Sequence, residues 1–235
     1  MSAIRGPVIQ TRIFILSLAR ERNRRLHALA QIRQTGLAFE IVDALDSRML
    51  RPELMEVPAS AWSLSNGEVA CYLSHLRLLQ RLSDYDLDYA IILEDDFVLQ
   101  ESSSLSLSTV LDRLPAGADH VQLNDTKDKV FDQYRRLESG QVFNRVSPTN
   151  VGSYGYVVSR KLADYILSHH SIPKMPIDHL FIELSRRTDE FGFYDLNERL
   201  IGFLADEPSC IDRMEQAQRA RKTLREWWDE RWIRR

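Results

Sequence analysis

The sequence has few cysteines, no long apolar run and no excess of basic charge. Its 235 residues include two cysteines, Cys71 and Cys210, too few and too far apart for a disulfide scaffold. The apolar run at residues 13–18 is too short to cross a bilayer and has no signal-peptide cleavage pattern. The formal net charge of −3 argues against nucleic acid as a partner. We therefore expect reduced thiols and a cytoplasmic protein.

The first part of the chain predicts a strand, a helix and a second strand. Residues 13–18 are rich in branched and aromatic side chains, which is typical of a buried strand. Residues 20–35 carry apolar side chains near helical spacing, and Gly36 is a typical helix stop. Residues 38–42 predict the second strand. This order indicates a parallel sheet with helical crossovers, in a chain long enough for one substantial core.

The middle of the chain continues this alternation. Ser65 and Glu68 have the spacing of a capping box, which predicts the start of an amphipathic helix. Residues 89–93 are nearly all apolar and predict a strand in the centre of the sheet. Further strands are predicted at residues 120–123 and 154–158, and the second is followed by a helix. A proline-bracketed turn and another helix complete the pattern.

Three adjacent carboxylates follow the predicted central strand: Glu94, Asp95 and Asp96. The carboxyl ends of parallel strands are where open α/β sheets bind ligands. Three like charges raise the cost of ionisation, and a divalent cation reverses that cost. Mg²⁺ or Mn²⁺ prefers such oxygen ligands and leaves coordination positions for phosphates. The residues predict a metal–diphosphate site, and a solvated acidic turn is the alternative.

Six motifs carry a family resemblance. In order along the chain they are "IFILSLARERNRR", "FEIVDALD", "NGEVACYLSHLRLLQRL", "YAIILEDDFVL", "GSYGYVVSRKLADYIL" and "MPIDHLF". Together they resemble glycosyltransferase family 25, the lipooligosaccharide galactosyltransferase group that is related to collagen galactosyltransferases. The resemblance covers about residues 12–212. One departure is Ser17, where the family usually has asparagine.

The resemblance implies a GT-A type α/β fold, with a Rossmann-like, mostly parallel central sheet flanked by helices. It assigns this domain to residues 1–212. The implied activity is the inverting, metal-dependent transfer of a hexose, typically galactose from UDP-galactose, onto a glycan or lipid-linked oligosaccharide acceptor such as lipooligosaccharide. Mn²⁺ or Mg²⁺ and a UDP-sugar donor are the implied cofactor and substrate. A metal-dependent phosphohydrolase and a non-catalytic carbohydrate-binding module are the alternatives.

The resemblance also implies roles for single residues. Glu94 and Asp96 have the spacing of a D-x-D motif and are predicted to bind the metal, with His179 as a third ligand. Asp178 is predicted to be the general base that takes the proton from the acceptor hydroxyl. A helix N-cap is the alternative role for Asp178, and an exposed position is the alternative for His179.

Seven residues are predicted to contact the donor: Ser17, Leu18, Arg20, Arg25, Glu68, His75 and Asp95. Glu68, Cys71 and His75 fall on one strip of the predicted helix, and the family pattern turns this strip toward the donor. For Glu68 the capping box alone is the alternative, and for His75 it is a buried histidine. Cys71 is interpreted as a small core residue. For the arginines, which suit phosphate oxygens, a solvated helix face is the alternative.

The last segment, residues 213–235, predicts a basic, aromatic C-terminal helix. Residues 211–235 contain eight basic and five acidic residues and three tryptophans, Trp227, Trp228 and Trp232. Such a helix suits an anionic membrane surface, which would place the protein at the inner membrane beside a lipid-linked acceptor. Packing on the domain or on a second subunit is the alternative. The polar stretch 124–148 is predicted to select the acceptor.

Overall fold

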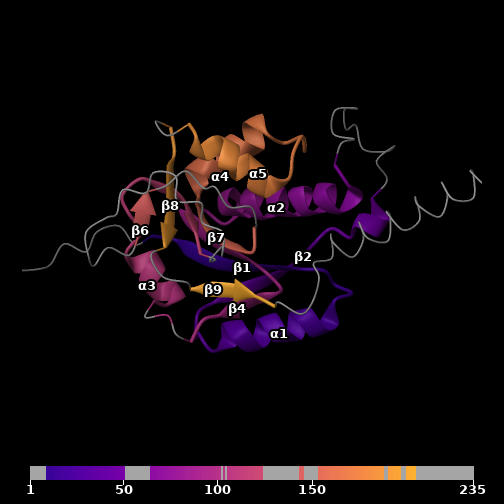
Figure 1. The fold of residues 1–235 in the computed structure, drawn as a ribbon, viewed down its shortest axis with the longest axis horizontal. Coiled ribbons are helices and arrows are strands. Elements are labelled where there is room, and N and C mark those ends of the chain that lie inside the picture. The colour runs from indigo at the N-terminus through magenta and orange to yellow at the C-terminus, as the bar shows by residue number, and fades with distance from the viewer. Residues whose placement is uncertain are drawn as a thin grey trace, which may run out of the picture.

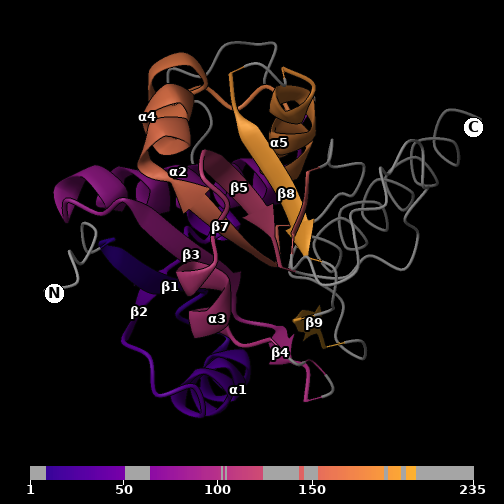
Figure 2. The ribbon, with the colours of Figure 1, turned by 90° about the vertical axis from the view of Figure 1, so that its left-hand side faces the viewer.

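A seven-stranded sheet with helices on both faces forms the body of the protein (Figures 1 and 2). The structure is a computed structural model that describes residues 9–50, 64–101, 103, 105–123, 143–145, 153–187, 190–196 and 200–204. The predicted C-terminal helix at 213–235 lies outside these residues, as does most of the stretch 124–148. Within the described part of the chain, no helix is long and apolar enough to span a membrane.

Five of the seven strands run in the same direction, which confirms the predicted α/β class. In their order across the sheet the strands are β2 (Phe39–Asp43), β1 (Thr11–Ser17), β3 (Tyr89–Glu94), β7 (Gly155–Ser159), β5 (Ala118–Gln122), β8 (Gly192–Leu196) and β6 (Phe143–Arg145). Strand β7 lies antiparallel between β3 and β5, and β6 is antiparallel to β8. The Rossmann-like part is therefore β2-β1-β3, and the rest of the sheet is mixed.

The helices divide the core into two layers. The described helices are α1 (Arg22–Arg33), α2 (Asn66–Asp84), α3 (Leu107–Asp112), α4 (Arg160–His169), α5 (Ile177–Ser185) and the short 3₁₀ helix η1 (Ser47–Met49). Helices α2, α4 and α5 cover one face of the sheet, and α1 and α3 cover the other (Figure 2). A two-stranded sheet of β4 (Phe97–Leu99) and β9 (Ile201–Phe203) lies on the α1 side.

Local sequence signals fix where several elements begin and end. Ser65 and Glu68 form the predicted capping box at the start of α2. The side chain of Ser159 accepts a hydrogen bond from the backbone of Leu162 and so begins α4 directly after β7. Gly36 follows α1 with a φ of 67°, a conformation that favours glycine. The capping box and the glycine stop are confirmed as predicted.

The register of the central strands brings the carboxyl ends of β1, β2 and β3 to one edge of the sheet. Leu16 of β1 is paired with Glu94 of β3, and Ser17 is paired with Asp43 of β2. Strand β7 starts at this same edge, because Gly155 is paired with Leu93. The carboxyl ends of β1, β2 and β3 and the start of β7 therefore surround one place on the molecule.

Candidate functional site

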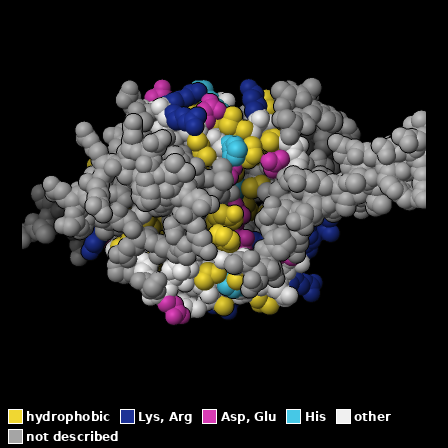
Figure 3. Space-filling model, viewed as in Figure 1, with side chains coloured by type: hydrophobic (Ala, Val, Ile, Leu, Met, Phe, Trp, Pro, Cys, Tyr) yellow, Lys and Arg dark blue, Asp and Glu magenta, His cyan; other side chains and the backbone are white. Residues whose placement is uncertain are grey.

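A pocket of about 100 Å³ opens at this edge, between the strand ends and the first turns of α2. One part of its wall is apolar, from Leu16, Leu18, Ala44 and Leu45. Another part is charged and includes Arg24, Glu94 and Asp95. Figure 3 shows hydrophobic and acidic side chains together around the hollow at the centre of this face. The pocket thus offers an apolar wall beside a charged one.

Two of the three adjacent carboxylates are buried against one arginine. Asp95 and Asp96 are 6% and 4% exposed, and Arg24 of α1 is 5% exposed. Arg24 Nε lies 2.8 Å from Asp95 Oδ1, and its Nη2 lies 2.5 Å from Asp96 Oδ2. Ser17 Oγ donates a hydrogen bond to Asp95 Oδ2 at 2.7 Å. The burial and the ion pairs exclude the alternative of a solvated acidic turn.

The single positive charge of Arg24 does not balance the three carboxylates Glu94, Asp95 and Asp96. Burial and, after it, the charge of Glu94 raise the pKa of Asp96 to about 7, although the charge of Arg24 opposes both. Burial also raises the pKa of Asp95. Asp96 Oδ1 has no hydrogen-bond partner among the described residues. A cation would therefore compensate the remaining negative charge of the carboxylates and bind the unpartnered oxygen of Asp96.

Glu94, the last residue of β3, has a different environment. Its side chain is 24% exposed, accepts a hydrogen bond from Ser153 Oγ at 2.5 Å, and has its Oε1 3.6 Å from His75 Nε2. Burial alone would raise the pKa of Glu94, but His75, Ser153 and Arg24 hold it below its ordinary value. Glu94 is therefore ionised at neutral pH, and Asp96 is divided between its charged and neutral forms.

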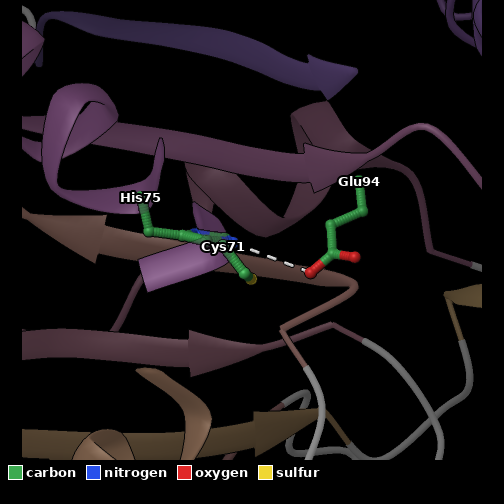
Figure 4. A group of neighbouring side chains, drawn as sticks. All are labelled: Cys71, His75 and Glu94. Carbon is green, nitrogen blue, oxygen red and sulfur yellow. Dashed lines mark ion pairs between the residues drawn. The ribbon is translucent and has the colours of Figure 1, made fainter. Parts of the chain in front are cut away.

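The predicted strip on α2 faces inward and meets Glu94. The ligand atoms of Cys71, His75 and Glu94 all lie within 4.8 Å of one another (Figure 4). His75 is fully buried, and its Nδ1 lies 2.7 Å from Tyr156 Oη. Burial and the charges of Glu94 and Asp178 raise the pKa of the Cys71 thiol well above its usual value. Cys71 also lines the pocket, so it is more than a core residue.

The two arginines predicted to contact the donor, Arg20 and Arg25, each form an ion pair with an acid. Arg25 Nη2 lies 2.5 Å from Asp43 Oδ1 and donates to the backbone oxygen of Ser17 at 3.1 Å. Arg20 Nη1 lies 2.5 Å from Asp46 Oδ2, and Arg20 lines the pocket. Neither arginine is on a solvated helix face, the alternative given from the sequence. Their contact with the donor stays a prediction.

The remaining predicted residues lie at the starts of two helices. Glu68 accepts a hydrogen bond from the backbone N–H of Ser65 at 2.7 Å, so its side chain serves the capping box. Asp178 is half-buried in the first turn of α5 and accepts from the backbone N–H of His179 at 2.9 Å. The N-cap of α5 is Pro176, so Asp178 does not have the alternative capping role. Its role as a base stays a prediction.

The predicted metal ligands are not assembled into one group. His179 is exposed on α5. Cys71, His75 and Glu94 are the only three potential ligands that lie this close together in the described part of the chain, so Glu94, Asp96 and His179 do not form such a group. The set of Glu94, Asp96 and His179 remains a prediction.

Arg24 was one of four arginines after the first strand that the sequence offered as phosphate ligands, but its pairing with Asp95 and Asp96 was not predicted. The contact of Ser153 with Glu94 and that of Tyr156 with His75 were not predicted either. A signal for Arg24 exists, because the buried residues of α1 are Arg24, Ala28 and Ile32, spaced four apart. Ser153 and Tyr156 enter the site only because β7 runs antiparallel beside β3. Sequence spacing alone does not indicate that pairing.

Comparison with known proteins identifies the family. A model described as Glycosyltransferase family 25 (LPS biosynthesis protein) matches residues 10–181. The lipooligosaccharide biosynthesis protein lic2B of Haemophilus influenzae is 29% identical over 169 residues, 66% of this chain and 62% of that protein. Procollagen galactosyltransferase 2 of Homo sapiens is 24% identical over 186 residues, 71% of this chain and 29% of that protein.

A third relative has a different description. It is a probable inactive glycosyltransferase 25 family member 3 of Bos taurus, 28% identical over 115 residues, 44% of this chain and 19% of that protein. This chain spans at most 62% of the length of these three relatives. The family model nevertheless matches most of the chain, which confirms the resemblance seen in its motifs. The chain belongs to glycosyltransferase family 25.

Proposed function

We propose that the protein is an inverting, metal-dependent glycosyltransferase that moves a hexose onto a glycan acceptor such as lipooligosaccharide. Galactose from UDP-galactose is the proposed donor sugar, and the lipid-linked acceptor places the enzyme on the cytoplasmic side of the inner membrane. The observation that carries the proposal is the group of three carboxylates at the end of β3, beside a pocket with one apolar wall. Family membership and the galactosyltransferase among the relatives support it.

The pocket suits the two parts of a nucleotide sugar. Its apolar wall, which includes Leu16, Leu18 and Leu45, suits a base and a ribose ring. Its charged wall suits a diphosphate, provided that a cation offsets the carboxylates. In the proposed complex, Arg24 shares its guanidinium between the carboxylates and the phosphate oxygens, which are acceptors of the same geometry.

The residues fit a divalent cation. The group contains hard oxygen donors, and Asp96 keeps an oxygen without a hydrogen-bond partner among the described residues. Burial, and then the charge of Glu94, raises the pKa of Asp96, and a cation would favour its charged form. Glu94 and Asp96 would hold the ion, with His179 as the predicted third ligand. When bound, the ion offsets the charge of the departing diphosphate.

Asp178 is the proposed general base. Its charge acts on the Cys71 thiol at the pocket wall, so it lies near the site. It is half-buried at the start of α5 and remains accessible to an acceptor. In the proposed reaction, Asp178 takes the proton of the acceptor hydroxyl while that oxygen attacks the anomeric carbon and the bond to the diphosphate breaks.

A donor screen tests this function. UDP-galactose and other UDP-sugars are incubated with the protein and a glycan acceptor, with and without Mn²⁺, and transfer is measured. We expect transfer that depends on Mn²⁺, and a rise in Tm when UDP and Mn²⁺ are added together. Asp96→Asn should remove both effects, and Asp112→Asn, an exposed acid at the end of α3, should keep both. A wild-type protein that shows neither effect would contradict the proposal.

The relative named as inactive favours a second candidate, a non-catalytic carbohydrate-binding module. It predicts binding of a sugar or nucleotide sugar with no transfer across the same panel. The phosphohydrolase alternative predicts release of phosphate from diphosphate esters without an acceptor. The screen separates the three functions when phosphate release is measured on the same samples, beside transfer and the rise in Tm that reports binding.

A further inference from the structure

We propose that Cys71, His75 and Glu94 form a site for a thiophilic divalent cation such as Zn²⁺. This site is distinct from the proposed diphosphate-bound metal, although both use Glu94. The proposal rests on the geometry of α2 and β3 and does not require transferase activity. One consequence, inhibition by Zn²⁺, does rest on the proposed function.

The three ligands come from two packed elements. Cys71 and His75 are four residues apart on α2 and therefore lie on the same face. Glu94 reaches toward them from the end of β3, and the three ligand atoms lie within 4.8 Å of one another (Figure 4). A sulfur, an imidazole nitrogen and a carboxylate oxygen are all zinc ligands, and three protein ligands leave a fourth position for water.

The orientation of His75 supplies an independent argument. The side chain is 0% exposed, its Nδ1 contacts Tyr156 Oη at 2.7 Å, and its Nε2 has no hydrogen-bond partner among the described residues. When Nδ1–H donates to Tyr156, Nε2 presents its lone pair to Cys71 and Glu94. This is how a histidine that binds a metal is usually held, with its second nitrogen hydrogen-bonded. A cation between His75 Nε2 and Glu94 Oε1, which lie 3.6 Å apart, would satisfy a buried nitrogen that has no hydrogen bond among the described residues.

The chemistry of the site selects the cation. The sulfur ligand favours Zn²⁺ and Co²⁺ over Mg²⁺, which prefers oxygen. On binding, the S–H bond of Cys71 breaks, its proton passes to water or buffer, and a metal–sulfur bond forms. Cys71 and Glu94 both line the pocket, which gives an ion a path to these two ligands.

Occupancy of this site should oppose sugar transfer. A Zn²⁺ ion on Glu94 occupies a carboxylate that the proposed donor site needs, and it adds a charged centre to the pocket wall. We therefore expect Zn²⁺ to inhibit transfer that is measured with Mn²⁺ present.

Co²⁺ is the direct probe, because a cobalt–thiolate bond produces a charge-transfer band in the near ultraviolet. The full, untagged chain is titrated with Co²⁺ alone. We expect the band in the wild type and in the matched control Cys210→Ser. It should be lost in Cys71→Ser and weakened in Glu94→Gln. A folded wild type without the band at saturating Co²⁺, or a band that survives Cys71→Ser, would overturn the proposal.

A second measurement needs no variant. Wild-type chain is alkylated with iodoacetamide with and without Zn²⁺, and the modification of each cysteine is followed by peptide mass spectrometry. Zn²⁺ should slow the modification of Cys71 several-fold more than that of Cys210, and equal rates with and without Zn²⁺ would overturn the site. A cobalt band in a protein that transfers no sugar would keep the cation site and reject the proposed function. Sugar transfer by a protein that shows no cobalt band would keep the proposed function and reject the cation site.

Discussion

At the scale of single residues, Arg24 decides whether two buried carboxylates can stay ionised. Its guanidinium lies 2.8 Å from Asp95 and 2.5 Å from Asp96, and all three side chains are buried. Without the arginine, both acids would keep their desolvation cost and lose the only ion-pair partner that they have in the described part of the chain. Removal of one partner from a buried ion pair is therefore more costly here than at a surface.

This predicts that Arg24→Met lowers the free energy of unfolding by about 3–5 kcal/mol. The loss should be larger at pH 8 than at pH 5, because the acids of the variant can take up protons at the lower pH and so lose their charge. Urea unfolding at both pH values measures the change. The matched control is Arg22→Met, an exposed position on the same helix, which should cost little. Equal losses in the two variants would contradict the role given to Arg24.

The acids were predictable from the sequence, and their partner was harder to find. Three carboxylates after an apolar strand indicated a site at the sheet edge, and the structure places them beside a pocket. The apolar pattern of the first helix, however, included Leu26, which is 64% exposed. The buried stripe begins at Arg24, a charged residue that hydropathy assigns to the surface, so the pattern misplaced the helix face.

At the scale of elements, the start of strand β7 packs against the small sheet of β4 and β9. Gly155 begins β7, and a Cβ placed there would lie 2.0 Å from Ile201 Cδ1 and 2.9 Å from Leu93 Cδ2. Ile201 belongs to β9, so the glycine permits β9 to approach β7 and β3. The small sheet in turn holds Phe97, directly after the acids.

Gly155→Ala should therefore cost about 1–3 kcal/mol of stability, the range of an overpacked core. Ile201→Val removes the Cδ1 atom that the new methyl group would meet. The double variant should lose less than the sum of the two single losses, and Ile201→Val alone should cost about 0.5–1.5 kcal/mol. Thermal or urea unfolding of the four proteins completes the cycle. Strict additivity would show that the close approach does not limit the packing.

Long periodic elements were predicted well, and short ones were not. Helix α2 has a capping box and an apolar face, and strand β3 is an apolar run, so both are found near their predicted bounds. Strands β4 and β9 have three residues each and exist only because they pair with each other. Their local sequence carries too few residues for a periodicity. Strand β8, Gly192–Leu196, was also not predicted, because its residues show neither a continuous apolar run nor a clear alternation.

At the scale of the whole molecule, two buried groups give stability opposite dependences on pH. His120 of β5 is 1% exposed, packs against the rings of Tyr156, Phe181 and Phe193, and has no hydrogen-bond partner for either ring nitrogen among the described residues. Burial lowers its pKa to about 3 from an ordinary 6.5. Asp96 has a pKa raised to about 7 from an ordinary 3.8.

The direction of each effect follows from which state binds more protons. Below pH 6.5 the unfolded chain protonates His120 and the folded chain does not, so His120 lowers stability as the pH falls from 6.5 toward 3. Between about pH 4 and 7 the folded chain keeps a proton on Asp96 that the unfolded chain has lost, so Asp96 lowers stability as the pH rises. Each contribution is on the order of a few kcal/mol.

The two contributions can be separated by variants measured across pH 4–8 without metal. His120→Leu should flatten the loss of stability below pH 6.5, because the buried titratable group is gone, whereas the exposed control His169→Gln should keep the wild-type slope. Asp96→Asn should raise the free energy of unfolding most at pH 7 and above, where the wild type carries a buried charge, even though the same variant is expected to lose transfer. An Asp96→Asn protein that is less stable than the wild type at pH 8 would mean that the Asp96 charge is already well compensated by Arg24. The carboxylates would then have no excess charge to draw a cation to the sheet edge.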